Sequence, residues 1–108
     1  MDEPSRIALL NDSLRTTFCG GRVMMTRGVA ALPEGERAVV IERVRSFDAF
    51  DKANDPYCEH DFGRIEVGGS AYFWKIDYYA LDMESGSEDP ADPESTARVL
   101  TIMMASEY

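Results

Sequence analysis

The fold is decided by residues 60–79, which read HDFGRIEVGGSAYFWKIDYY. Two runs rich in β-branched and aromatic residues, 60–67 and 70–79, flank a pair of glycines. This pattern predicts a β-hairpin closed by a two-residue type I′ turn. The turn also fixes the register of the strands, since it pairs Val67 with Ser70 and every other pair follows from that one. We therefore expect an antiparallel hairpin at the centre of the sheet.

The register divides the hairpin into two faces, because side chains alternate along a strand. One face carries Ile65, Tyr72, Trp74, Ile76 and Tyr78. The other carries Phe62, Phe73, Lys75, Asp77 and Tyr79. A chain of 108 residues has enough helix to cover one of these faces, with little left for the second. An aromatic, sparsely charged surface is typical of an interface centre, so we expect the second face to be a homodimer contact or the anchor for a partner.

The first half of the chain predicts two helices and a strand. Residues 4–18 place Ile7, Leu10, Leu14 and Phe18 on one face of an amphipathic helix. Two glycines end this helix, as glycine often does.

A short strand over 23–26 and a second helix over 33–47 follow. A proline suits the first position of that helix, and Val40 and Val44 supply its buried stripe. Residues 48–59 lack periodicity and predict a loop.

The end of the chain has two interpretations. Residues 93–107 predict a third helix, which Asp92 would cap and Pro93 would begin. A buried strand over 99–104 is the alternative, because that run is short and apolar on both parities. We favour the helix. The expected order is α-β-α-β-β-α, a single α+β domain over residues 1–108 with helices packed on a small antiparallel or mixed sheet.

The net charge of −9 comes entirely from the second half of the chain. Residues 1–54 hold eight acids and eight bases, whereas residues 55–108 hold twelve acids and three bases. One stretch, 82–94, contains six acids and no base, namely Asp82, Glu84, Glu88, Asp89, Asp92 and Glu94. A one-sided field of this kind attracts basic partners and repels nucleic acid. The alternative is an ordinary solvated loop.

The cysteines and the N-terminus indicate a cytoplasmic protein. Cys19 and Cys58 form neither a disulfide framework nor a metal motif, so we expect two buried, reduced thiols. The chain opens with Asp2 and Glu3 rather than with basic residues, and no apolar run exceeds four residues. We therefore expect no secretory signal and no contact with a membrane.

The single histidine, His60, is the candidate for catalysis. The hairpin register places it opposite Asp77, with Lys75 on the same face. A carboxylate beside an imidazole is what general-base chemistry requires. If the chain is an enzyme, His60, Asp77 and Lys75 are its candidate catalytic residues, and Tyr79 is a polar assistant. The alternative is a His–Asp pair that serves only the structure.

No motif points to a metal or a cofactor. The only plausible metal ligands are Glu59, His60, Asp61 and Asp77, and alternation along a strand keeps Glu59 and Asp61 away from His60. The glycine pairs match neither the P-loop nor the dinucleotide fingerprint. The aromatic residues 72–74 lack the surrounding bases of a nucleic-acid stacking platform. We expect no metal, no cofactor and no direct binding of nucleic acid.

Six segments spread over nearly the whole chain form a pattern of their own. They are residues 11–12, 21–23, 26–33, 59–63, 73–79 and 98–103. Together they resemble the bacterial domain-of-unknown-function family DUF3768, to which the His-Asp-Phe-Gly element is fairly specific. The resemblance implies a small stand-alone protein of plasmids and other mobile genetic elements, where anti-restriction and anti-CRISPR proteins are common and often acidic. The family has no established catalytic residues, so none is transferred.

We therefore hypothesise a non-enzymatic, acidic protein-binding module. It would block or modulate a nucleic-acid-handling protein by imitating nucleic acid, as an inhibitor of the anti-CRISPR or anti-restriction type. The six acids of residues 82–94 would bind this basic partner together with Phe73 and Tyr79. The alternative is a small enzyme or ligand-binding domain that uses His60 and Asp77.

Overall fold

The computed structural model describes residues 5–108. Its elements are α1 (Arg6–Thr17), β1 (Arg22–Met25), α2 (Arg27–Ala30), α3 (Glu34–Arg45), β2 (Phe62–Val67), β3 (Ser70–Tyr79), β4 (Ala97–Met104) and the 3₁₀ turn η1 (Ala105–Glu107). Within residues 5–108, no helix is both long enough and apolar enough to cross a bilayer.

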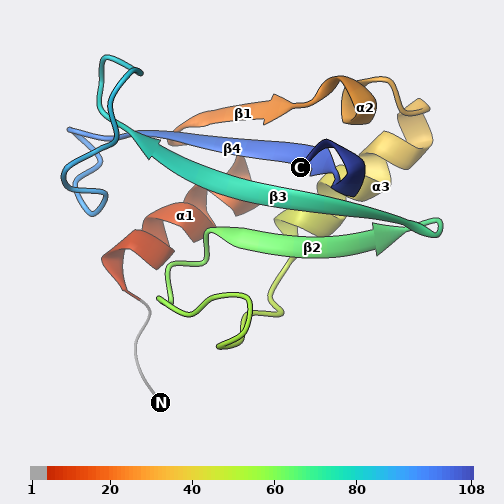
Figure 1. The fold of residues 1–108 in the computed structure, drawn as a ribbon, viewed down its shortest axis with the longest axis horizontal. Helices are drawn as coiled ribbons and strands as arrows, with labels where there is room; N and C mark the ends of the chain where they lie inside the picture. Colours follow the sequence, from red (N-terminus) through yellow and green to blue (C-terminus); the bar gives the residue numbers. More distant parts are fainter. Residues whose placement is uncertain (1–4) are drawn as a thin grey trace.

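The strands form one mixed sheet in the order β1-β4-β3-β2 (Figure 1). Strand β1 runs parallel to β4, whereas β2, β3 and β4 are antiparallel to their neighbours. The long strands β3 and β4 occupy the centre, and β1 and β2 are the edges. Helices combined with this sheet confirm the expected α+β class.

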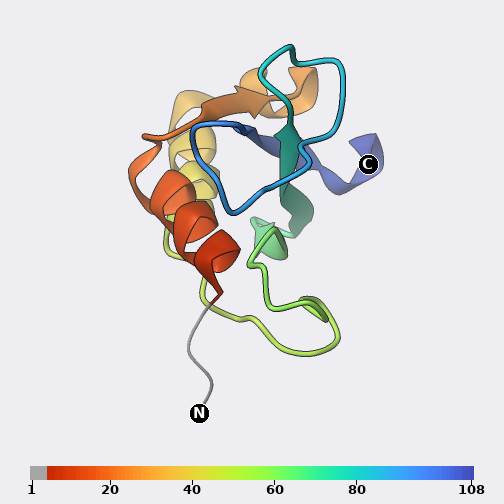
Figure 2. The ribbon, with the colours of Figure 1, turned by 90° about the vertical axis from the view of Figure 1, so that its left-hand side faces the viewer.

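The helices cover one face of the sheet. Figure 2 shows α1 and α3 on one side and η1 on the other. We call the two sides the core face and the open face. The core lies between the sheet and the two helices, and its fully buried side chains include Leu14, Val40, Trp74, Leu100 and Ile102. By the strand registers, the open face carries Arg22, Met24, Phe62, Arg64, Glu66, Phe73, Lys75, Asp77, Tyr79, Val99, Thr101 and Met103.

The hairpin has the expected turn and register. Gly68 and Gly69 adopt φ angles of 59° and 82°, as a type I′ turn requires. Val67 pairs with Ser70, and the register continues to Phe62 opposite Lys75. The face with the tryptophan packs on the core, as the buried Tyr72, Trp74 and Ile76 show.

The expected third helix is wrong, and the alternative strand is what forms. Residues Ala97–Met104 are β4, the central strand that joins β1 to β3. A central strand is covered on both sides, which explains apolar residues on both parities: Leu100 and Ile102 face the core, while Val99 and Met103 are buried on the open face. Asp92 caps a turn instead of a helix, since its carboxylate accepts from the Glu94 amide at 2.9 Å.

Helix α1 buries a polar stripe that its sequence did not indicate. Leu14 is fully buried as expected, but Ile7 and Leu10 are only half-buried. Asn11 and Arg15 are buried instead. Asn11 bonds to Glu59, Tyr78 and Arg98, whereas Arg15 donates to the carbonyls of Val44 and Arg45 at the end of α3.

Two smaller expectations also change. Cys19 and Cys58 are free thiols, but both are exposed, because each lies in a connection outside the helices and strands. The short helix α2 was not expected, and it follows β1 directly. Residues 48–61 contain no helix or strand, in line with the expected loop.

Gly63 lies where the core has no room for a side chain. A Cβ at this position would meet Trp74 Nε1 at 2.3 Å and Phe47 Cζ at 2.9 Å. We expect Gly63→Ala to lower the free energy of unfolding by about 1–3 kcal/mol, since the indole and the ring must shift. Denaturant unfolding followed by Trp74 fluorescence measures this. Gly35→Ala in α3 is the control, because its Cβ meets nothing within 4 Å. It should stabilise the protein by about 0.5–1 kcal/mol. Equal effects of the two substitutions would contradict the packing.

Glu107 holds η1 against the rest of the domain. Its carboxylate accepts from Thr26 Oγ1 at 2.6 Å and from the amides of Gly28 and Met104 at 2.9 Å. These hydrogen bonds, that of Thr26 foremost, hold the pKa of Glu107 below its ordinary value.

The pH dependence of stability should reveal this anchor. The folded pKa lies below the unfolded value of 4.5, so the ionised carboxylate stabilises the fold above that pH. The contribution is lost as the pH falls through the folded-state pKa. We expect Glu107→Gln to lower the melting temperature near neutral pH and to match the wild type in strong acid. Glu84→Gln is the control with the same change of charge. A wild-type advantage that persists in strong acid would show that the effect is not ionic.

Candidate functional site

The acidic residues lie on an ordered loop that connects β3 to β4, residues 80–96, which we call the acidic loop. The Ala80 amide donates to the Ser85 carbonyl at 2.8 Å, and the Ser87 amide donates to the Tyr78 carbonyl at 3.1 Å. The hydroxyls of Ser87 and Thr96 are hydrogen-bonded at 2.7 Å across the loop. These contacts hold the loop in one conformation.

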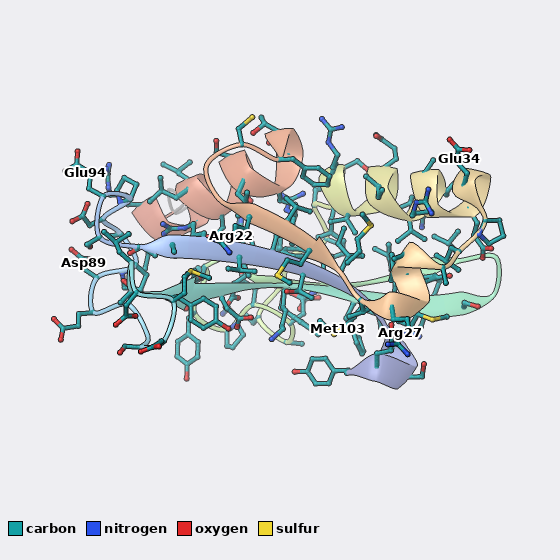
Figure 3. The ribbon with its side chains drawn as sticks, turned by 90° about the horizontal axis from the view of Figure 1, so that it is seen from above. Arg22, Arg27, Glu34, Asp89, Glu94 and Met103 are labelled. Carbon is teal, nitrogen blue, oxygen red and sulfur yellow. The ribbon has the colours of Figure 1, made fainter. Side chains whose placement is uncertain are left out.

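The six carboxylates of the acidic loop divide into two kinds. Asp82, Asp89 and Asp92 accept hydrogen bonds from backbone amides of the loop. The amides of Glu84 and Ser85 lower the pKa of Asp82 below its ordinary value. By contrast, the side chains of Glu84, Glu88 and Glu94 make no hydrogen bond or ion pair within the part of the chain that the structure describes, and all three are exposed. Figure 3 shows Asp89 and Glu94 at one end of the molecule, opposite Glu34.

Two arginines anchor the acidic loop through its backbone carbonyls. Arg6 Nε donates to the Ala91 carbonyl at 2.8 Å, and Arg98 donates through Nη2 to the Pro90 carbonyl. Both bonds are made to the backbone, so the loop is anchored while its carboxylates stay available. Among residues 5–108, none of the six acids is in a salt bridge.

Asn11 is the centre of the polar network beneath the loop. Its side chain is fully buried and uses every hydrogen-bonding group it has. Nδ2 donates to the Glu59 carbonyl at 3.0 Å and to the Tyr78 hydroxyl at 2.8 Å. Oδ1 accepts from Arg98 Nε at 3.0 Å. One side chain of α1 therefore joins the loop before β2 to β3 and β4.

Burial sets the ionisation of this network. Desolvation raises the pKa of the Tyr78 hydroxyl above its ordinary value and lowers that of the Arg98 guanidinium. The guanidinium also lies over the Tyr78 ring, 5.4 Å from its centroid. Tyr78 is therefore a neutral hydrogen-bonding group near neutral pH.

His60 lies outside the hairpin, so its expected position opposite Asp77 is wrong. Strand β2 begins at Phe62, and His60 has a φ of 56°, in the left-handed region. That backbone conformation turns its side chain away from the ladder. Asp77 pairs with Val99 across the sheet, and its carboxylate lies 2.8 Å from Lys75 Nζ on the open face. The structure therefore separates His60 from both Asp77 and Lys75.

The actual partners of His60 come from α1 and from the loop before β2. Nδ1 lies 3.0 Å from both carboxylate oxygens of Asp12, and Nε2 lies 3.7 Å from Asp55 Oδ2. The ring of Phe50 stacks on the imidazole with centroids 3.9 Å apart. Arg15 closes the cluster by donating to Asp12 at 3.0 Å. We interpret the cluster as a clamp that holds residues 50–60 against α1.

His60 borders a shallow cavity of about 190 Å³, which Phe50, Lys52, Asp55 and Cys58 also line. Cys58 and His60 line the same cavity, but no hydrogen bond joins the thiol to the imidazole. Within residues 5–108, no three His, Cys, Asp or Glu side chains are grouped so that they could hold a metal ion.

Comparison with known proteins agrees with the pattern of the sequence. The family model described as "Protein of unknown function (DUF3768)" matches residues 25–107. The chain belongs to this family. The matched region includes the acidic loop, His60 and the whole hairpin, whereas Asn11 and Asp12 lie before it. Searches of curated proteins and of solved structures give no match to this DUF3768 member.

The remaining predicted binding residues lie on the open face. Phe73 and Tyr79 are half-buried there. The chain itself supplies a neighbour that was not expected: the Tyr108 ring lies 5.2 Å from the Phe73 ring and 6.0 Å from the Phe62 ring between centroids. The aromatic part of the open face is therefore partly covered by the residue that follows η1.

Sequence reasoning missed the residues that hold the site together. Asn11 and Arg15 are not part of the apolar stripe that predicts α1, because asparagine and arginine are usually exposed. A signal existed for Arg98, since it shares strand parity with the buried Leu100 and Ile102. An arginine at a core position predicts a buried polar partner, and Asn11 is that partner.

Removing the Asn11 side chain tests the network. We expect Asn11→Ala to lower the free energy of unfolding by about 2–4 kcal/mol, because it leaves Arg98 and Tyr78 with unsatisfied buried groups. Ser13→Ala, at an exposed position of the same helix, should change it by less than about 0.5 kcal/mol. Urea unfolding monitored by circular dichroism measures both. A loss below about 1 kcal/mol for Asn11→Ala would show that water replaces the amide.

Proposed function

We propose that this DUF3768 protein is a non-enzymatic binding module that recognises the basic surface of a nucleic-acid-handling protein through its acidic loop. The proposal rests on how the acidic loop is anchored and on the lack of ion pairs at its carboxylates within residues 5–108. Its backbone is anchored by arginines through carbonyl oxygens, and within residues 5–108 none of its six carboxylates is in a salt bridge. A preorganised row of unpaired acids binds a basic cleft without first losing chain entropy or breaking internal ion pairs.

The charge distribution supports a protein partner rather than nucleic acid itself. Six acids within one loop resemble a row of phosphates, and such a row competes for cationic sites that bind a nucleic-acid backbone. The protein would then block or modulate its partner in the manner of an anti-CRISPR or anti-restriction inhibitor. The catalytic set named for the enzymatic alternative is not brought together, because His60 contacts Asp12 and Asp55 and lies apart from Asp77.

The three glutamates of the acidic loop make no hydrogen bond within residues 5–108, so their replacement tests the effect of charge alone. Replacing Glu84, Glu88 and Glu94 with glutamine removes three charges and leaves the aspartates that stabilise the loop. We expect proteins captured by the wild type to be enriched in nucleic-acid-binding proteins. We expect the triple variant to bind its partner at least about tenfold more weakly, since each charge pair contributes roughly 0.5–1 kcal/mol. A DNA duplex should compete with the wild-type protein for the same partner. Affinity capture followed by titration measures these effects.

The matched control removes the same charge elsewhere. Glu34, Glu36 and Glu42 lie on α3, and their replacement by glutamine should leave partner binding unchanged. Equal loss in both triple variants would reduce the effect to net charge alone. Partners that are no more basic than the background, or that DNA fails to displace, would contradict the proposal.

A further inference from the structure

The edge strand β2 has unpaired backbone groups along its outer side. In an antiparallel ladder, successive residues direct their N–H and C=O groups to alternate sides. The Ile76 amide donates to the Asp61 carbonyl at 2.9 Å, which fixes the alternation. Gly63, Ile65 and Val67 therefore bond to β3, whereas Phe62, Arg64 and Glu66 point outward. Within residues 5–108, no backbone or side-chain group forms a hydrogen bond with the outward N–H and C=O groups of these three residues.

A trough runs along this edge. One cavity of about 580 Å³ lies between the start of β2 and the loop after α3, and a second of about 400 Å³ continues along the rest of the strand. Phe47, Ala49 and Arg64 line both cavities, so the two are adjacent. Figure 1 shows the loop after α3 passing beside β2 on the side away from β3.

Hydrogen bonds within the loop after α3 hold the outer wall of the larger cavity. Asp51 and Asn54 use their polar atoms within the loop: Asp51 accepts from the amides of Ala53 and Asn54, and Asn54 donates to the Ala49 carbonyl. Ala49 and Ala53 line the loop side of the larger cavity, and Phe62 and Phe73 line its strand side. The larger cavity is therefore a preformed site for an apolar side chain.

We propose that this trough binds an extended segment of a partner protein, which adds to the sheet as a strand beside β2. The outward groups of Phe62, Arg64 and Glu66 would form the backbone hydrogen bonds of this β-augmentation. A large apolar side chain of the segment would enter the cavity near Phe47 and Phe62. The mode is independent of the acidic loop, since it uses none of its residues.

The charges of the chain favour a basic segment over a second copy. In the smaller cavity Asp48 and Glu66 are balanced by Arg43 and Arg64, and Arg64 pairs with Glu66 at 2.9 Å, but the chain as a whole carries −9. A second copy would bring the same negative field, whereas a segment with lysines beside its apolar residue is attracted. The loop after α3 also stands on the outer side of the cavity, where a single extended chain fits more readily than the edge of a whole domain. The opposite edge strand, β1, has only four residues, so it offers a shorter edge for an added strand than β2 does.

Hydrogen exchange on the whole protein tests the proposal. The probe is the blocked peptide Lys-Thr-Val-Phe-Val-Thr-Lys. We expect saturation with it to slow exchange of the Phe62, Arg64 and Glu66 amides about tenfold or more, and to leave the already protected Gly63 and Ile65 amides unchanged. The same peptide N-methylated at every amide should give no protection, because neither of its edges then has donors and both carry methyl groups.

Two variants at one position separate the backbone from the side chain. Arg64→Pro removes an outward N–H and no bond to β3, so it should abolish peptide protection while Gly63 and Ile65 stay protected. Arg64→Ala keeps the N–H and should retain the protection. If the proline variant fails to fold, the N-methylated peptide still decides.

Three results would overturn the proposal. The first is protection that does not alternate along β2, and the second is equal protection by the N-methylated peptide. The third is slow exchange of the outward amides that increases with protein concentration in the absence of peptide, which would assign the edge to a second copy.

Discussion

The burial of one asparagine constrains the whole end of the molecule that carries the candidate site. Asn11 is inaccessible to solvent, so each of its polar groups must find a partner in the protein. Those partners are the Glu59 carbonyl, the Tyr78 hydroxyl and Arg98, which come from three separate segments. Arg98 in turn reaches the acidic loop at Pro90. The positions of the loop before β2 and of the acidic loop therefore depend on the same buried amide.

The chain uses many of its arginines as donors to backbone carbonyls. Five arginines donate to backbone carbonyls at the ends of helices and in loops: Arg6, Arg15, Arg37, Arg45 and Arg98. Of these five, only Arg15 also pairs with a carboxylate within residues 5–108, where the other arginine and lysine pairs are Arg64 with Glu66 and Lys75 with Asp77. Arg6 and Arg98 bring positive charge to the acidic loop, but they bond to its carbonyls and not to its carboxylates. Within residues 5–108, the six carboxylates of the loop are therefore left without a salt bridge.

The sheet presents different chemistry on each of its surfaces, because helices cover only one face. The core face is closed by α1 and α3, and the open face is partly covered by η1 and Tyr108. Glu107 fixes η1 there through Thr26 and Gly28. The edge of β2 is a third surface, bordered by a loop whose polar atoms are already satisfied. A small domain of this architecture can therefore offer more than one interface without a second core.

The sequence by itself determined the local structure wherever short-range chemistry decides it. The glycine pair at 68–69 set the turn and the register of the hairpin, because few other residues adopt positive φ at two successive positions. The periodicity of 33–47 located α3, and the acids of 82–94 located the charged loop. Only the tertiary structure decided which residues of α1 are buried, whether 97–104 is a strand, and what His60 contacts. Asn11 and Arg98 are stable inside only because each satisfies the other, and no local pattern records a partner 87 residues away. Likewise, β4 is a strand because β1 and β3 lie on its two sides, and His60 meets Asp12 because the left-handed backbone at residue 60 leaves the ladder.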